Sequence, residues 1–118
     1  MIKLSTSNFK WKEIEQVYPF ERSSNDEPLY CKQVTFTTSA SASSITYYNH
    51  NIQNMKYMHG FLAILDYGNS ISWAQNTFTS GPDSAGFSAG SVQVTFKNPG
   101  WGAWASKTAT VQIKYTKL

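Results

Sequence analysis

The C-terminal part of the chain alternates between apolar and polar side chains with a period of two. Val92, Val94 and Phe96 alternate with polar residues, and residues 109–116 (ATVQIKYT) repeat the pattern. Such alternation is typical of antiparallel strands that turn one face toward a core and the other toward water. The pattern predicts two strands, joined by the Gly- and Trp-containing loop of residues 98–107.

The same periodicity predicts earlier strands over residues 29–36 and 45–48. Residues 55–67 form the most apolar segment, and we expect a central strand buried on both faces. A buried helix is the alternative, but Gly60 and the turn-like sequence of residues 66–69 favour a strand that ends in a hairpin. Residues 70–73 would be the return strand, and residues 80–84 (SGPDS) predict a further turn.

The N-terminal segment is the one stretch with helical spacing. Trp11, Ile14 and Tyr18 lie three and four residues apart, as on one face of a short helix. An edge strand or an arm that lies on a neighbour is the alternative, and both interpretations stay open. We therefore divide the chain into an arm or short helix (1–17) and a binding domain (18–118). Six to eight short strands predict an all-β, antiparallel β-sandwich, jelly-roll-like or a small barrel.

Length, charge and cysteine content narrow the class of protein. A chain of 118 residues is the usual size of one domain. The net charge of +3 comes from scattered residues, so no nucleic-acid footprint is present. No apolar run reaches the roughly 20 residues that span a membrane, and no signal peptide is recognisable, so we expect synthesis in a cytoplasm. Cys31 has no partner for an intrachain disulfide, and we expect a buried structural thiol.

Residue patterns that carry catalysis or bind metals are missing from the sequence. His50 and His59 have no acidic or cysteine partner at ligand spacing, so we expect no metal and no cofactor. The carboxylates cluster before residue 28, which disfavours a paired-carboxylate glycosidase site. No Gly-x-Ser-x-Gly elbow and no phosphate-binding loop occurs. The sequence therefore predicts a binding protein and not an enzyme.

The loop between the last two predicted strands is the strongest candidate binding site. Trp101 and Trp104 lie among Gly and Ala residues that leave their rings accessible, and Asn98 and Ser106 offer hydrogen bonds. Three interpretations stay open: ligand binding, contact with another subunit or a partner protein, and packing on the domain itself. A second aromatic set, for which we favour core and interface packing, comprises Tyr47, Tyr48, Tyr57, Tyr67 and Trp73.

Several segments of the chain are similar, in the same order, to the motifs of one known family. Residues 27–36 (EPLYCKQVTF) are similar to the opening "GKPLYxKxVxF", and Tyr18 and Glu21 are similar to the "YSxxE" before it. Residues 49–55 (NHNIQNM), followed by the apolar residues 61–65, are similar to the "HGIxNI" turn and strand. Residues 109–117 (ATVQIKYTK) are similar to the closing "YVTIxYTK". Together these segments resemble the C-terminal receptor-binding domain of bacteriophage tail-fibre and tail proteins, and the resemblance covers residues 18–117.

The chain also departs from that family pattern. Asn51 replaces the glycine of "HGI", a tolerable change because Asn also adopts left-handed backbone conformations. Asp26 and Glu27 replace the "GK" before the proline, and the Trp-containing loop is not part of the pattern.

The resemblance implies a virion tail protein, made in the host cytoplasm, that binds host cell-surface saccharide and is a homotrimer. It would also contact other virion tail proteins. The alternative is a structural virion protein, such as a capsid decoration or baseplate component, that binds no receptor. A bacterial or toxin-like lectin is a third possibility, which the missing export signal disfavours.

Overall fold

The computed structural model describes residues 8–66, 68, 70–73, 86–100 and 104–118. Within these residues the secondary structure is β-strand, without an α-helix, and no helix long and apolar enough to cross a membrane occurs in them. The strands are β1 (Gln16–Arg22), β2 (Pro28–Thr37), β3 (Ile45–Asn49), β4 (Met55–Asp66), β5 (Ser70–Trp73), β6 (Gly86–Ala89), β7 (Gln93–Lys97) and β8 (Thr108–Lys117). The predicted all-β fold is confirmed.

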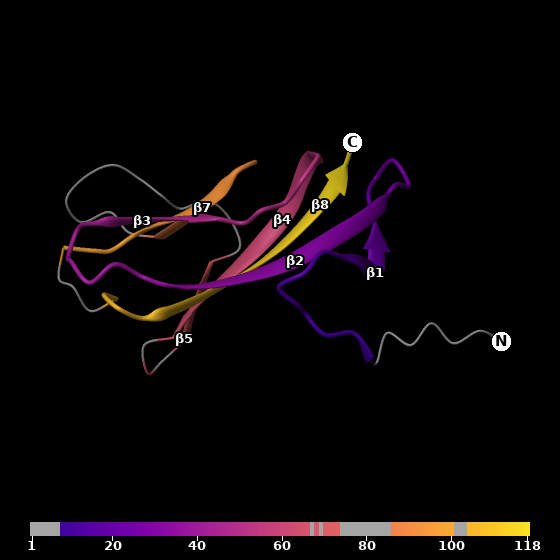
Figure 1. Ribbon diagram of the computed structural model, residues 1–118. Helices are drawn as coiled ribbons and strands as arrows, with labels where there is room; N and C mark the ends of the chain where they lie inside the picture. The colour runs from indigo at the N-terminus through magenta and orange to yellow at the C-terminus, as the bar shows by residue number, and fades with distance from the viewer. Residues whose placement is uncertain (1–7, 67, 69, 74–85, 101–103) are drawn as a thin grey trace.

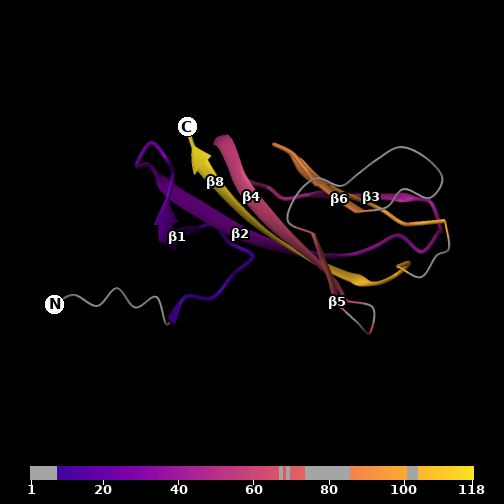
Figure 2. The same ribbon diagram turned by 180° about the vertical axis from the view of Figure 1, so that it is seen from behind.

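The strands form two antiparallel sheets, which Figures 1 and 2 show from opposite sides. The larger sheet has the order β1-β2-β8-β4-β5, and the smaller has the order β3-β7-β6. The smaller sheet covers the half of the larger one where β2 ends and β8 begins, and β1 lies at the other end (Figure 1). The arrangement is sandwich-like, and its sheets do not close into a barrel within the described residues.

The core lies between the two sheets. The larger sheet contributes alternate residues of β2, β4 and β8 to the core, and the smaller sheet contributes residues of β6 and β7. Aromatic contacts join the sheets, since the Phe36 ring lies 6.4 Å from Phe87 and 5.1 Å from Tyr48. The members buried in this core are Val34, Phe36, Phe61, Ala63, Leu65, Phe87, Ala89, Val94, Phe96, Ala109, Val111, Ile113 and Tyr115.

The prediction that residues 55–67 are buried on both faces is wrong. Phe61, Ala63 and Leu65 are buried, but Leu62 between them is 37% exposed. The reason is that the smaller sheet covers only one face of β4, which we call the inner face. The opposite or outer face of the larger sheet carries Leu62 and is accessible. The predicted hairpin after β4 is confirmed, with Asp66 paired to Ser70.

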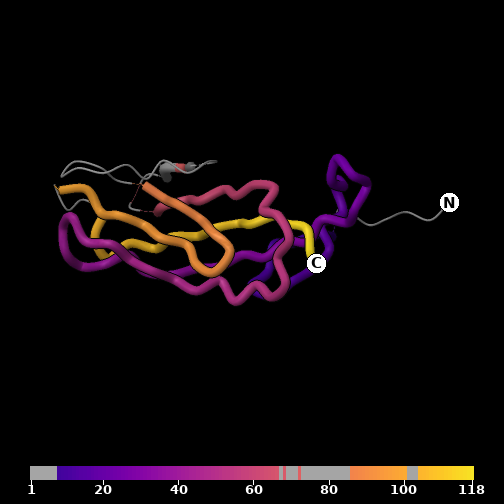
Figure 3. The backbone as a smooth tube through the Cα atoms, turned by 90° about the horizontal axis from the view of Figure 1, so that it is seen from above, coloured from indigo at the N-terminus to yellow at the C-terminus, as the bar shows by residue number. Residues whose placement is uncertain are grey.

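The N-terminal segment is an arm and not a helix over its described part. Residues 8–15, which we call the arm, precede β1 and lie at the opposite end of the molecule from the turn of residues 38–44 (Figure 3). The helical spacing of Trp11 and Tyr18 has a different cause, because the arm folds back beside β1 and brings the two rings together. The predicted turn at residues 80–84 lies outside the described residues.

Candidate functional site

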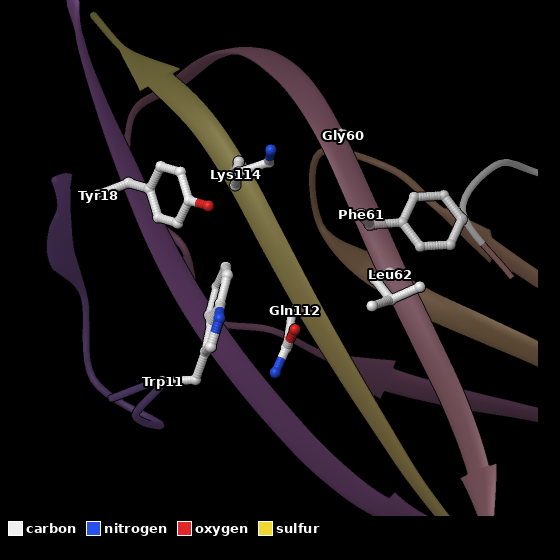
Figure 4. Close-up of a pocket in the computed structure, with 7 residues that line it drawn as sticks. All are labelled: Trp11, Tyr18, Gly60, Phe61, Leu62, Gln112 and Lys114. Atoms are coloured by element: carbon white, nitrogen blue, oxygen red, sulfur yellow. The ribbon is translucent and has the colours of Figure 1, made fainter. Parts of the chain in front are cut away.

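A pocket of about 400 Å³ opens on the outer face of the larger sheet. The arm and β1 form one side of it, and β8 and β4 form its floor and the opposite side (Figure 4). The residues that line it are Trp11, Tyr18, Gly60, Phe61, Leu62, Gln112 and Lys114. They come from the N-terminal part, the middle and the C-terminal part of the sequence, so that only the folded chain assembles the site.

The strand register explains which side chains reach the floor. Lys114 is paired with Gly60 on β4, and Gln112 is paired with Leu62. Cross-strand partners project to the same face of a sheet, and successive residues alternate between faces. The buried Ile113 and Val111 therefore face the core, while Gln112 and Lys114 face the pocket. The polar half of the alternating pattern in β8 thus becomes the floor of the site.

Two aromatic rings form the wall on the side of the arm. The Trp11 and Tyr18 rings lie 5.7 Å apart between centroids, at an interplanar angle of 38°. Phe9 makes edge contacts with both of them, at 5.7 Å in each case, and Phe20 packs against Phe9 and Tyr18. We call Phe9, Trp11, Tyr18 and Phe20 the aromatic cluster. Its edge-to-face contacts, which aromatic pairs prefer, fix the orientation of the two lining rings.

Hydrogen bonds on both sides of Trp11 hold the arm against the sheet. The Lys10 carbonyl oxygen accepts a hydrogen bond of 2.7 Å from Gln16 Nε2, and the Lys12 carbonyl oxygen accepts one of 2.8 Å from the Gln33 backbone N–H. Glu15 adds a third attachment, because its carboxylate accepts hydrogen bonds from Tyr115 and Lys117. The aromatic wall is therefore formed before any ligand binds, which lowers the entropic cost of binding.

Lys114 is the charged side chain among the residues that line the pocket. Its ammonium pairs with the Glu21 carboxylate of β1 and lies 5.1 Å from the centroid of the Tyr18 ring. The neighbouring Gln112 donates a hydrogen bond of 3.1 Å from Nε2 to Gln33 Oε1. This orientation leaves the Gln112 carbonyl oxygen as an acceptor at the pocket floor.

The residues that line the pocket can hold a ligand without forming a covalent bond. Two ring faces, an amide and an ammonium converge on one concavity, a combination that holds small ligands with an apolar face and several polar groups. Cys31 is fully buried, and burial raises the pKa of its thiol to about 11, so it is not a thiolate at neutral pH. No group of three or more potential metal ligands occurs in the described part of the chain.

The predicted loop site is only partly described. Trp101 lies outside the described residues. The Trp104 ring is partly buried and lies 6.1 Å from the Phe96 ring, and its carbonyl oxygen accepts a hydrogen bond of 2.6 Å from Thr38 Oγ1. Ser106 is exposed and adopts a left-handed conformation, with φ of 54°.

Asn98 of the same loop has a fully buried side chain. Its Nδ2 donates hydrogen bonds of 2.7 Å to the Ser39 carbonyl oxygen and 2.9 Å to the Ser41 carbonyl oxygen. These contacts give Asn98 a structural role in the 38–44 turn. The ligand-binding role of Asn98, Trp101, Trp104 and Ser106 stays a prediction, and the pocket lies on other elements.

The remaining predicted residues are spread over the molecule. His50 is buried in the turn after β3, where its Nε2 lies 2.8 Å from the Gly90 carbonyl oxygen and its Nδ1 accepts a hydrogen bond from the Ile52 N–H. His59 is exposed. In the second aromatic set, Tyr47 and Tyr57 are exposed and Tyr48 stacks on Phe36, while Tyr67 and the Trp73 side chain lie outside the described part.

The spacing of the aromatic residues indicates the aromatic cluster, but the helical interpretation of the N-terminal segment did not use this spacing. Phe9 and Trp11 are two residues apart, and so are Tyr18 and Phe20. A spacing of two places both members of each pair on one side of an extended chain. The two pairs therefore indicate two extended segments whose aromatic side chains lie on a common face.

Comparisons with known proteins do not assign a family. A scan against protein-family models finds no match, and searches of curated proteins and of solved structures find none either.

Proposed function

We propose that this chain is a receptor-binding domain of a bacteriophage tail fibre or tail tip, and that its pocket binds carbohydrate of the host cell surface. The observation that carries the proposal is the pair of aromatic rings, Trp11 and Tyr18, beside the Gln112 amide and the Lys114 ammonium. The tail-protein resemblance of residues 18–117 supplies the biological setting.

The physical basis is the mixed character of a sugar ring. One face of a pyranose presents C–H groups that pack on an aromatic face, and its edge presents hydroxyls that both donate and accept hydrogen bonds. Trp11 and Tyr18 would cover the C–H face, while the Gln112 carbonyl oxygen and the Lys114 ammonium would bind hydroxyls. The pocket volume of about 400 Å³ lies in the range of small-ligand sites.

A shallow site of this kind binds one sugar weakly. Display of several copies on one particle would convert weak contacts into strong attachment, because the second and third contacts are intramolecular. The homotrimer that the resemblance implies would supply this multivalency. The proposal requires neither catalysis nor a cofactor.

The test is binding of the purified domain to a glycan array and to host cells. Trp11→Ala removes the larger ring of the wall, and we expect at least a tenfold loss of affinity. Tyr57→Ala is the matched control, because this aromatic side chain is 62% exposed and lies outside the pocket. Trp101→Ala and Trp104→Ala test the predicted loop in the same assay. Full binding by a folded Trp11→Ala variant would contradict the pocket as the site.

A structural virion protein is the second candidate, favoured by the apolar surface of the arm and β1. Ile14 is 64% exposed, Val17 57% and Phe20 52%, all within residues 14–20, and contiguous exposed apolar surface is typical of protein contacts. On this alternative the domain would ignore host cells and would attach to particles that lack it. Val17→Ser combined with Phe20→Ser would then abolish incorporation into particles, and neither the unmodified domain nor Trp11→Ala would bind host cells.

A further inference from the structure

The charge of the pocket is balanced by a residue outside its lining. Lys114 projects from β8 into the pocket, and the Glu21 carboxylate of β1 pairs with its ammonium. The side chains are 30% and 48% exposed, so the pair is at the rim and is reached by solvent. The Tyr18 ring contacts the same ammonium at 5.1 Å. Two neighbours therefore already stabilise the positive charge.

We propose that the Lys114–Glu21 pair makes the site selective for uncharged saccharides and that Glu21 is the residue that excludes acidic ones. This inference rests on the proposed function, since it names the class of sugar that the same pocket takes. It assigns Glu21 a specificity role that depends on charge and not on shape.

The selectivity follows from the number of N–H donors on Lys114 and from the sign of the charges around it. An ammonium has three N–H donors, so Lys114 can bond Glu21 and still donate to a sugar hydroxyl. A ligand carboxylate would have to compete with Glu21 for the ammonium and would lie beside a second negative charge. Like charges placed together disfavour the wrong partner. A neutral hydroxyl meets neither obstacle.

The chain contains a matched control for this pair. Glu27 pairs with Lys56 at 3.3 Å, the side chains are 33% and 36% exposed, and neither residue lines the pocket. Glu21→Gln and Glu27→Gln each remove one negative charge, so the net charge of +3 becomes +4 in both variants. A general electrostatic effect would change both variants alike, and a local effect would change only Glu21→Gln.

The experiment compares a neutral oligosaccharide with its uronic acid counterpart, which differs only in a carboxylate at C6. We expect the unmodified domain to bind the neutral sugar at least tenfold more tightly. Glu21→Gln should tighten binding of the acidic sugar at least tenfold, in a manner that added salt weakens, and Glu27→Gln should not. Thermal unfolding confirms that both variants are folded.

The outcomes separate this inference from the proposed function. Equal affinity of the unmodified domain for both sugars overturns the inference alone, and so does an unchanged preference in Glu21→Gln. Absence of binding to every saccharide overturns the proposed function and the inference with it. If both variants gained the same affinity for the acidic sugar, the net charge of the domain would be the cause. That result would also overturn the role of Glu21.

Discussion

The hydroxyl of Tyr115 donates a hydrogen bond of 2.6 Å to the Glu15 carboxylate and so ties the end of β8 to the arm. Tyr115 is fully buried, and burial together with the nearby carboxylate raises the pKa of its hydroxyl, which stays protonated as the donor. Lys117 donates a second hydrogen bond of 2.7 Å to the other oxygen of Glu15. One carboxylate thus receives two donors, both from β8.

Removal of the Tyr115 hydroxyl should destabilise the domain. A hydrogen bond to a charged group contributes about 2 kcal/mol, so we expect Tyr115→Phe to lower the free energy of unfolding by that amount. Urea unfolding at pH 7 measures the change. Tyr57→Phe serves as the control, because its exposed hydroxyl should change stability by less than about 0.5 kcal/mol. Equal stability of the two variants would show that the Glu15 contact adds nothing.

Glu15 should also make stability depend on pH in the acidic range. Burial raises the pKa of this carboxyl, but the hydrogen bonds from Lys117 and Tyr115 outweigh burial and lower it below 4.5. Since the folded pKa is below the unfolded one, the stabilisation is complete above about pH 4.5 and is lost as pH falls through the folded pKa. Urea unfolding between pH 7 and pH 3 should show that Glu15→Gln is less stable at pH 7 and that the difference shrinks in acid. A constant difference would contradict this linkage.

His50 should produce a second pH dependence at higher pH. Burial is the main cause that lowers the pKa of its imidazole below 6.5, although the hydrogen bond to the Gly90 carbonyl oxygen opposes it. The folded state therefore favours the neutral ring, and its contribution is complete above about pH 6.5 and declines as pH falls toward the folded pKa. We expect the stability difference between the unmodified domain and His50→Gln to shrink from pH 8 to pH 5. A stability difference that does not change between pH 8 and pH 5 would exclude His50 as the source of this pH dependence.

The sequence predicted correctly those strands that bury only one of their two faces. In β8 the buried Val111 and Ile113 alternate with Gln112 and Lys114, so the pattern gave both the strand and its two faces. In β4 the pattern misled, because Leu62 is apolar and yet lies on the outer face. A sequence pattern reports hydrophobicity and not burial, and Leu62 is 37% exposed where it lines the pocket.

The pocket could not be predicted from the sequence, for a different reason. Trp11 and Gln112 line one pocket but are about a hundred positions apart, and no local pattern links them. Their proximity depends on pairing between β1, β2 and β8, and on the irregular register of β1 between Val17 and Arg22. The sequence predicted the Trp-containing loop as a site because the residues of the loop are adjacent along the chain, and the pocket residues are not.

Asn98 should prove important for folding. Its buried side chain donates to the Ser39 and Ser41 carbonyl oxygens, and Asn98→Ala would remove both of these hydrogen bonds from the 38–44 turn. We expect a loss of about 2 kcal/mol in the free energy of unfolding, measured by urea denaturation. Ser106→Ala, from the same loop, is the control. Loss of this exposed side chain should lower the free energy of unfolding only slightly. A stable Asn98→Ala variant that no longer binds saccharide would instead support the predicted ligand role.

Gly60 gives the most direct test of whether the pocket is the binding site. A Cβ atom at this position would meet no heavy atom within 4 Å, so a side chain would extend into the open space of the pocket. Gly60→Leu should therefore fold as well as the unmodified domain, or slightly better, because glycine within a strand costs roughly 0.5–1 kcal/mol relative to alanine. We expect at least a tenfold loss of saccharide affinity by calorimetry, since the new side chain occupies ligand volume opposite Lys114.

Gly90 offers the matched substitution, because a Cβ atom there also meets nothing within 4 Å and the residue does not line the pocket. Gly90→Leu adds the same apolar side chain to the same protein, so any nonspecific effect on solubility or self-association would appear in both variants. Loss of binding in Gly60→Leu alone would locate the ligand between β4 and the aromatic cluster. Unchanged binding in a folded Gly60→Leu variant would exclude this pocket and return attention to the loop of Trp101 and Trp104.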